Sequence, residues 1–303
     1  MTDLIIIGAG TAGMTAALYA LRGGKSVLVL EQDCVGGQIS RSPRVENFPT
    51  VKAISGSELS DRLFEQITEF GAEFELEKVL AVEKRGEGNF LVKTDYGAHE
   101  CRAVILATGV KHKTFHLPRE EELVGKGISY CAVCDGAFYK DEEVCLIGDA
   151  NTALQYSILL SQYCKKVSVC TWMDRFFGDK ALVDVLLKQS NVEWIKEVNL
   201  VAFEGKTELE GCTFERRADG SKFTLPVKAC FVAIGQIPDN KAFEDLVKLD
   251  KEGYILADES CRTSAEGVFV AGDCRTKAVR QLTTAAADGA VAAVAACAYL
   301  DQL

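Results

Sequence analysis

The stretch Leu4–Glu31, LIIIGAGTAGMTAALYALRGGKSVLVLE, decides the fold. An apolar run leads into glycines spaced as Gly8-x-Gly10-x-x-Gly13, a helix-forming run follows, and a second apolar run ends on Glu31. In such a strand–turn–helix unit the glycines allow a tight turn and bring the backbone close to a pyrophosphate at the helix N-terminus. An acid at the end of the second strand can bind ribose hydroxyls. The stretch therefore predicts a Rossmann-type dinucleotide-binding unit.

A second copy of this unit begins at Val144 with VCLIGDANTALQYSILLSQYCKKVSVCTW. Each copy is followed by a similar strand pair that ends in a small-residue turn, at Phe90–Gly109 and at Thr213–Gly235. The C-terminal segment contains GVFVAGDC and then an alanine-rich run, and it is predicted to complete the first domain. We therefore expect an α/β fold of two Rossmann-like, three-layer ββα domains, with the second inserted into the first.

The predicted boundaries follow from where the two copies start and stop. The expected domains are 1–113 with 242–303, built on the first copy, and 114–241, which is built on the second copy and carries the paired cysteines. The hinges are expected near 110–114 and 237–241.

Composition narrows the class of protein. The chain has 303 residues, 48% hydrophobic residues and a net charge of −10, as expected of a globular protein without a broad surface for nucleic acid or anionic membrane. The N-terminus lacks a cationic targeting segment, and no uncharged apolar stretch reaches the roughly 20 residues of a membrane span. These features predict a cytoplasmic protein.

Twelve cysteines are present, and most stand singly inside apolar runs, such as Cys145 in VCLIG and Cys230 in KACFVAIG. This placement favours buried small side chains. Cys131 and Cys134 differ, because the segment YCAVCDG brings two thiols and a carboxylate together. A zinc site would need a second cysteine or histidine pair, which the three histidines do not supply, so no metal is predicted.

The cysteine pair and the following Asp135 are typical of a redox-active dithiol. Asp135 is the expected acid or base, since it directly follows Cys134. The pair is also expected at a helix N-terminus, where thiolates are stabilised. The predicted catalytic residues are Cys131, Cys134 and Asp135.

Several short motifs occur in order along the full chain: Gly36-Gly37-Gln38, VENFP at 45–49, Ala107-Thr108-Gly109, CAVCDG, Gly272-Asp273 and Arg280-Gln281. In this respect the chain resembles the low-molecular-weight thioredoxin reductases. The resemblance implies that 1–113 with 242–303 is an FAD-binding domain and that 114–241 is a redox domain like an NADPH domain. It also implies a homodimer, and thioredoxin or a thioredoxin-like disulfide protein as substrate. It assigns the flavin-side sulfur to Cys134 and the sulfur that meets thioredoxin to Cys131.

The resemblance also assigns Gln38 and Asn47 to the surroundings of the flavin, Asp273 to the ribityl chain, and Arg280 and Gln281 to the flavin end of the last helix. Together with the glycine motif, the predicted FAD-binding residues are Gly8, Gly10, Thr11, Ala12, Gly13, Glu31, Gly37, Gln38, Asn47, Ala107, Thr108, Gly109, Gly272, Asp273, Arg280 and Gln281.

The second copy departs from the dinucleotide motif. Aligned on Gly8 and Gly148, it has Ala150 at the second glycine, Ala153 at the third, and Asp149 between the first two. Ala153 is harmless. Ala150 places a methyl group where a pyrophosphate would touch the backbone, and Asp149 places a negative charge beside that phosphate.

The ribose end departs as well, in the segment TWMDRFF that begins at Thr171. Thr171 stands where an NAD site would have an acid. In the thioredoxin reductases this segment typically reads His-Arg-Arg, three residues, then Arg; here Trp172, Met173 and Phe177 occupy the arginine positions, and Arg175 is a possible substitute. Two or three lost charge-assisted contacts, at roughly 1.5–3 kcal/mol each, would weaken NADPH binding by about two to six orders of magnitude.

The residues predict only that the nucleotide donor site is missing. The resemblance then implies reduced ferredoxin as the electron donor, because some thioredoxin reductase relatives with a similarly degenerate second domain use it. Two alternatives stay open: an NADPH-dependent thioredoxin reductase with atypical donor contacts, and a non-catalytic redox-sensing flavoprotein or flavin disulfide oxidase. Since ferredoxins are generally acidic, a basic docking patch is expected. Its candidate residues are Arg275, Lys277 and Arg280, extended by Lys111 and Lys113.

Overall fold

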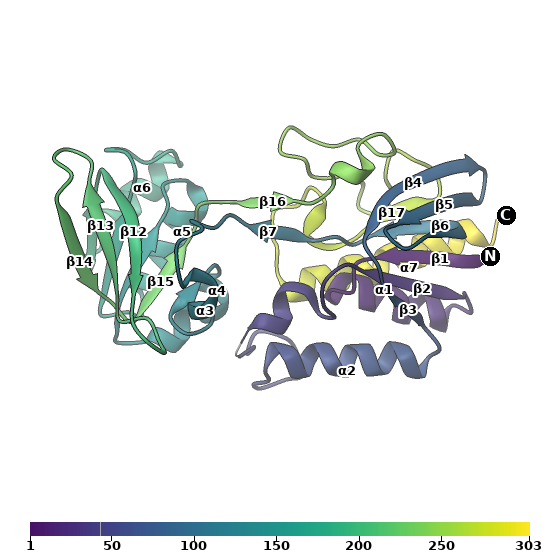
Figure 1. Ribbon diagram of the computed structural model, residues 1–303, viewed down its shortest axis with the longest axis horizontal. Coiled ribbons are helices and arrows are strands. Elements are labelled where there is room, and N and C mark those ends of the chain that lie inside the picture. The colour runs from purple at the N-terminus through teal and green to yellow at the C-terminus, as the bar shows by residue number, and fades with distance from the viewer. Residues whose placement is uncertain (43) are drawn as a thin grey trace. The chain divides into compact units, whose positions relative to one another are not determined.

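The computed structural model describes residues 1–42 and 44–303. The chain divides into two compact units, the first formed by 1–111 and 237–303 and the second by 112–236 (Figure 1). The division falls two residues before the first predicted boundary, 113, and five before the second, 241. The linking segments are β7 (Val110–His112) and β16 (Gln236–Pro238), which pair as a two-stranded sheet.

Unit 1 is built on a seven-stranded sheet of order β3-β2-β1-β6-β5-β4, with β17 also paired to β6. Strands β1, β2, β3, β6 and β17 pair in parallel, whereas β4 and β5 form antiparallel pairs. The bounds are β1 Thr2–Ile7, β2 Val27–Glu31, β3 Glu73–Leu76, β4 Val79–Gly86, β5 Asn89–Thr94, β6 Ala98–Leu106 and β17 Val268–Val270.

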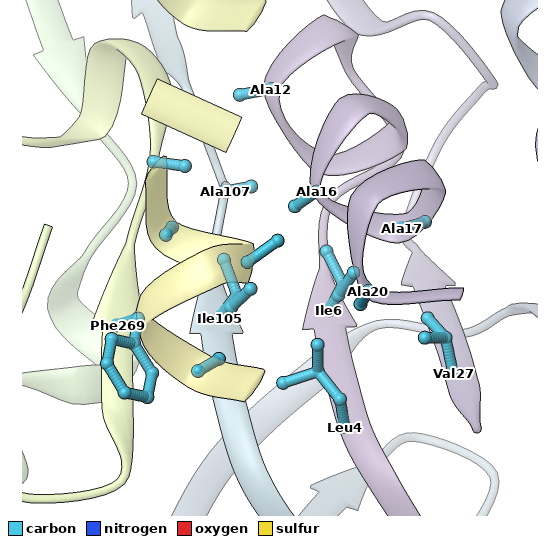
Figure 2. Packing of buried hydrophobic residues seen from close by; sticks show 14 of the residues in the cluster. Leu4, Ile6, Ala12, Ala16, Ala17, Ala20, Val27, Ile105, Ala107 and Phe269 are labelled. Atoms are coloured by element: carbon cyan, nitrogen blue, oxygen red, sulfur yellow. The ribbon is translucent and has the colours of Figure 1, made fainter. Parts of the chain in front are cut away.

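Both faces of this sheet are covered, which explains the unbroken apolar run in β1. Leu4 and Ile6 point into the cluster under the helices, while Ile5 and Ile7 belong to the cluster on the opposite face. The helices of unit 1 are α1 (Thr11–Arg22), α2 (Gly56–Glu69) and α7 (Leu282–Leu300). Figure 2 shows how alanines of α1, among them Ala16 and Ala20, pack over the sheet.

Helix α7 lies directly against α1. A methyl group added at Gly289 would come within 2.2 Å of the Ala12 carbonyl oxygen, so the two helices touch through small residues. By length and composition α7 is long and apolar enough to cross a membrane. One face of α7, with Ala292, Ala293 and Leu300, lies buried in the α1 cluster, whereas Val291 and Val294 are exposed.

Unit 2 has two sheets, one of order β11-β10-β9-β15-β8 and one of order β12-β13-β14. The strands are β8 Ile128–Ser129, β9 Glu143–Ile147, β10 Lys166–Cys170, β11 Val192–Ile195, β12 Val198–Glu204, β13 Gly211–Arg216, β14 Lys222–Pro226 and β15 Ala229–Val232. The helices are α3 Glu120–Leu123, α4 Ala132–Asp135, α5 Asn151–Ser161 and α6 Lys180–Leu186. Short 3-10 turns are η2 Gly136–Tyr139 in unit 2 and, in unit 1, η1 Gly37–Arg41, η3 Lys241–Phe243 and η4 Gly272–Cys274.

Unit 2 therefore has a helix–sheet core and a sheet–sheet core. Val144 and Leu146 of β9 pack under the helices, and Cys145 and Ile147 face the second sheet. The α/β prediction of two Rossmann-like domains, the second inserted into the first, is confirmed.

Candidate functional site

The glycine loop after β1 has the geometry that close contact with a pyrophosphate requires. Gly8 has φ +111°, and a methyl group on Gly13 would lie 1.8 Å from the Gly8 carbonyl oxygen, so α1 must start tightly against the strand. At Gly10, the N-cap of α1, the nearest atom to an added methyl group is 4.0 Å away. The loop is closed where the fold needs it and open where a ligand would approach.

Glu31 ends β2 next to this loop and is buried. Its Oε2 accepts the N–H of Ala9 at 2.8 Å, and its Oε1 accepts the N–H groups of Gln32 and Asp33, both at 2.9 Å. A carboxylate has about four acceptor positions, so one remains for a ribose hydroxyl. Glu31 was predicted to bind a ribose, and its carboxylate also holds the glycine loop in place through Ala9.

Within the described part of the chain, Thr11 Oγ1 and Asp273 Oδ1 are buried at this end of the sheet without a hydrogen-bond partner. Burial raises the pKa of the Asp273 carboxyl. Gly272, with φ +81°, brings the Asp273 turn against α1, since a methyl group there would lie 2.8 Å from Ala12 Cβ. Unpaired buried polar groups are costly, and hydroxyl and phosphate groups of FAD would satisfy these two.

Other residues predicted to bind FAD are held in unit 1 by hydrogen bonds. The Gln38 amide donates to the Val110 carbonyl oxygen, and Asn47 Nδ2 donates to Gln281 Oε1 at 3.3 Å. Thr108 Oγ1 donates to Oδ1 of the buried Asn240 at 2.9 Å, a contact that nothing in the sequence pattern indicated. Gly37 lies in η1, Ala107 and Gly109 lie on either side of Thr108, and Gly36 forms a bridge to Gly10.

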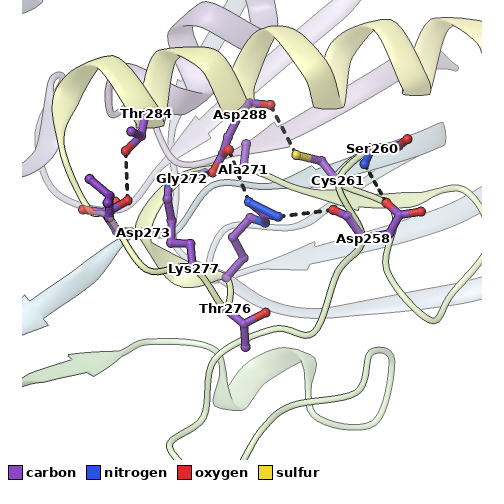
Figure 3. Close-up of polar contacts among 12 residues, drawn as sticks. Asp258, Ser260, Cys261, Ala271, Gly272, Asp273, Thr276, Lys277, Thr284 and Asp288 are labelled. Carbon is purple, nitrogen blue, oxygen red and sulfur yellow. Dashed lines mark hydrogen bonds and ion pairs between the residues drawn. The ribbon is translucent and has the colours of Figure 1, made fainter.

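Two cations of the predicted basic docking patch, Arg275 and Lys277, are buried and paired, so they offer no exposed charge to a partner (Figure 3). Asp288 of α7 accepts from Arg275 at 3.3 Å, from Lys277 at 2.8 Å and from the Gly272 N–H at 3.1 Å. The Arg275 and Lys277 side chains are only 10% and 9% exposed. Arg280 lies 4.2 Å from the Tyr254 ring centroid and donates to the carbonyl oxygen of Asp273, so these residues build the turn around Asp273. Lys111 and Lys113, the predicted extension of the patch, are exposed, and docking there stays a prediction.

The redox cysteines lie in unit 2 and are joined. Cys131 and Cys134 form a disulfide with a Cα–Cα distance of 5.3 Å, and both are half-buried. The expected helix is a single turn, α4, with Cys131 as its N-cap. The N–H of Cys134 donates to Cys131 Sγ at 3.2 Å, which places a backbone donor where negative charge on Cys131 would develop.

Asp135 lies beside this pair with one oxygen paired and one unpaired. Its Oδ2 accepts from Ser129 Oγ at 2.6 Å, and its buried Oδ1 has no partner. Burial raises the pKa of the Asp135 carboxyl, and the Ser129 hydrogen bond opposes this only in part. Ser129 also accepts from the Cys131 N–H at 3.1 Å, so it connects the proposed acid to the cysteine turn.

The segment before Cys131 is held by contacts that sequence reasoning missed. Tyr130 stacks on His112 at 4.9 Å between ring centroids and donates its hydroxyl to Glu120 Oε1 at 2.9 Å. The buried Glu120 also accepts from the N–H of Phe115 at 3.1 Å. Burial lowers the pKa of His112 to about 4, which keeps that ring neutral at physiological pH.

The second glycine loop matches the first in backbone form. Gly148 has φ +152°, and a methyl group there would lie 2.5 Å from the Ala233 carbonyl oxygen, as one on Gly8 would lie 2.3 Å from that of Ala107. Ala153 is accommodated in the helix core, as expected. Ala150 is the exposed N-cap of α5 and Asp149 precedes it, at the positions predicted to oppose a phosphate.

At the ribose end the three replaced arginine positions carry apolar side chains, and Trp172 and Phe177 are 54% and 56% exposed. Arg175 lies 4.9 Å from the Phe177 ring centroid. Arg217, from the end of β13, lies 4.4 Å from the Trp172 ring centroid and donates to its carbonyl oxygen. Two arginines therefore flank this segment, and the sequence indicated only Arg175.

The chain is similar to known proteins over nearly its whole length. The model of the pyridine nucleotide-disulphide oxidoreductase family matches residues 2–289. The thioredoxin reductase of Listeria monocytogenes is 38% identical over 303 residues, 99% of this chain and 94% of the relative. A "34.2 kDa protein in rubredoxin operon" of Clostridium pasteurianum is 38% identical over 298 residues, 98% of this chain and 97% of the relative. The crystal structure of thioredoxin reductase from Streptococcus pyogenes matches with a TM-score of 0.96 at 36% identity, covering 100% of this chain and 99% of that one.

The two dinucleotide-type domains and the joined cysteines thus define an FAD-dependent disulfide oxidoreductase. The chain belongs to the pyridine nucleotide-disulphide oxidoreductase family, in its branch of low-molecular-weight thioredoxin reductases.

Proposed function

We propose that this chain is a thioredoxin-disulfide reductase whose electrons come from reduced ferredoxin rather than from NADPH. One observation carries the choice of donor: at the N-terminus of α5, Asp149 and Ala150 stand where a nicotinamide nucleotide would place its pyrophosphate. The ribose end supports the same choice, because the expected arginines are replaced there by Trp172, Met173 and Phe177. The Clostridium pasteurianum relative takes its name from the operon of rubredoxin, a small iron protein, which fits a one-electron donor of that kind.

FAD would be held by the glycine loop, Glu31, Thr11 and the Asp273 turn, with Gln38, Asn47, Arg280 and Gln281 near its flavin end. When bound, it supplies the electron pair that opens the Cys131–Cys134 disulfide. The protein groups then carry the exchange with the substrate.

In that exchange the Cys131 thiolate attacks one sulfur of the thioredoxin disulfide and forms a mixed disulfide, while the other thioredoxin sulfur leaves as a thiolate. The Cys134 thiolate then attacks Cys131 Sγ, which restores the Cys131–Cys134 disulfide and releases thioredoxin as a dithiol. Asp135 holds the proton that a leaving thiolate takes up, which its raised pKa favours. We further propose a cytoplasmic homodimer.

The NADPH-dependent alternative has one observation in its favour. Arg175 and Arg217 both lie at the ribose end, and either guanidinium could bind a 2′-phosphate if it left its aromatic partner. Binding would then depend on whether this contact outweighs the charge of Asp149.

The test is anaerobic turnover of oxidised thioredoxin with reduced ferredoxin, NADPH or NADH as the sole donor, followed by the appearance of thioredoxin thiols. We expect thiols with ferredoxin, little or none with the nucleotides, and none with the Cys131→Ser variant. Efficient turnover with NADPH would favour the alternative. Failure with every donor, despite intact FAD, would favour the redox-sensing or oxidase class.

A further inference from the structure

Three cysteines that are far apart in the sequence meet inside unit 2. Cys145 on β9 and Cys230 on β15 are register partners on neighbouring parallel strands, and Cys212 lies on β13 in the facing sheet. Their sulfur atoms all lie within 4.8 Å of one another, and the Cys145 thiol donates to Cys212 Sγ at 3.7 Å. All three are 0% exposed.

Strand alternation explains why these side chains converge. In β9 and β15, Cys145 and Cys230 point between the two sheets, while their neighbours Val144 and Phe231 point toward the helices. Cys212 reaches the same layer from the opposite sheet. Across residues 1–42 and 44–303, this is the one group of three or more histidine, cysteine, aspartate or glutamate side chains close enough to share an ion.

The spacing fits three sulfur ligands around one ion. With metal–sulfur bonds of about 2.3 Å, sulfur atoms around a shared ion lie roughly 4 Å apart. Cysteine sulfur is a soft ligand that selects copper(I) or zinc over hard cations such as magnesium and calcium. The three sulfur atoms are thus already near coordination distance in the folded chain.

The surroundings distinguish copper(I) from zinc. Structural zinc takes four ligands, and only three are grouped here. Cys170 belongs to the same core cluster but stays outside the group, with its thiol 4.0 Å from the Ser168 carbonyl oxygen. Apolar neighbours such as Phe214 and Val232 line this layer, so water is not available as a fourth ligand.

We propose that Cys145, Cys212 and Cys230 form a three-sulfur copper(I) site, separate from the Cys131–Cys134 redox pair. Binding one Cu⁺ releases two thiol protons to solvent and leaves the third thiol as a neutral ligand, for a net charge of −1 and no transfer of electrons. Because the site is sealed, the ion enters while the two sheets of unit 2 form or separate. It binds the folded state only and stabilises unit 2 accordingly.

The test uses the full-length flavoprotein in a Cys131→Ser/Cys134→Ser background, so that the redox pair adds no thiols. The protein is produced in copper-supplemented medium, and a second sample is refolded from denaturant with copper(I) and FAD. Both are washed with a chromophoric copper(I) chelator, and the retained metal is counted. We expect one copper ion per chain, with the long-wavelength emission of copper(I)–thiolate centres.

Cys212→Ala should abolish both signals, and Cys145→Ala and Cys230→Ala should do the same. Cys101→Ala is the matched control, because Cys101 is equally buried but lies in unit 1, outside the group. Should the Cys212 variant fail to fold, X-ray absorption of the parent protein decides, with three sulfur neighbours expected around copper. No retained copper in either sample, retention that survives loss of Cys212, or zinc in place of copper would overturn the proposal.

Discussion

Asp135 holds its proton at a higher pH than an exposed aspartate does, because burial raises its pKa and Ser129 offsets only part of that rise. Above the folded-state pKa the carboxylate is charged, and burying that charge lowers the stability of the fold. The contribution of this group to stability is therefore fully present below the unfolded-state pKa and is lost as the pH rises through the folded-state value.

Asp135→Asn separates this energetic cost from the role in proton transfer. We expect the variant to be at least as stable as the parent at pH 8, with the difference shrinking as the pH falls through the pKa of Asp135. Thioredoxin reduction should fall by about 10²- to 10⁴-fold, the usual contribution of a general acid or base. Urea unfolding across pH and steady-state turnover measure the two effects. Unchanged turnover would remove Asp135 from the mechanism.

The two cysteines should behave differently when each is replaced. With Cys134→Ser, the Cys131 thiol can still attack thioredoxin but the mixed disulfide cannot be resolved, so a covalent complex should accumulate. Cys131→Ser should give no such complex. Both variants are reduced before mixing with oxidised thioredoxin. Intact-protein mass spectrometry under non-reducing conditions then measures the mixed disulfide. Accumulation with Cys131→Ser instead would mean that the two roles are reversed.

At the scale of elements, α7 is joined to the η4 turn by Asp288, which neutralises two cations that have almost no exposure. Asp288→Ala should lower the free energy of unfolding of unit 1 by about 3–5 kcal/mol, because it leaves Arg275 and Lys277 buried without their carboxylate. Urea unfolding followed by the release of FAD fluorescence is the measurement.

Asp239→Ala is the control, since the Lys111–Asp239 pair has side chains that are 69% and 46% exposed. An exposed pair of this kind contributes about 1 kcal/mol or less. If both variants lost the same free energy of unfolding, the Asp288 ion pairs would contribute no more than an exposed pair, contrary to this prediction.

The α5 loop offers a gain-of-function test. Asp149→Gly with Ala150→Gly should improve NADPH binding by roughly tenfold or more, because it removes a like charge near the phosphate and a methyl group from the backbone contact. Calorimetric titration measures the Kd. Ala153→Gly should bring no such gain, since Ala153 already fits the helix core. Micromolar binding by the unmodified chain would refute the interpretation of this loop.

The repeated strand–glycine–helix pattern made both Rossmann units predictable, because each unit is formed by residues that are close together in the sequence. In both units the first glycine, Gly8 or Gly148, lies where a side chain would clash with a backbone carbonyl oxygen. The single turn of α4 was not predictable, since its length depends on how the cysteine turn is held by Ser129. The pairing of Arg275 and Lys277 with Asp288 also lay outside local pattern, so a charged segment suggested a surface. The Cys145–Cys212 contact depends on the packing of two sheets.

At the scale of the whole molecule, charge and donor must be considered together. The net charge of −10 would repel an acidic ferredoxin, and Arg275 and Lys277 are both paired with Asp288. These two cations therefore add little long-range steering, and the proposed ferredoxin would have to dock through contacts at short range.

In the proposed function, the flavin is reduced by a one-electron protein donor and not by a nicotinamide nucleotide. The most direct test of this claim is an anaerobic titration of the purified yellow protein, in which loss of flavin absorbance is followed as reduced ferredoxin, NADPH or NADH is added. We predict complete bleaching with about four equivalents of a one-electron ferredoxin per chain, two for the Cys131–Cys134 disulfide and two for FAD, and little change with either nucleotide. Stoichiometric bleaching by NADPH at micromolar concentration would contradict the claim.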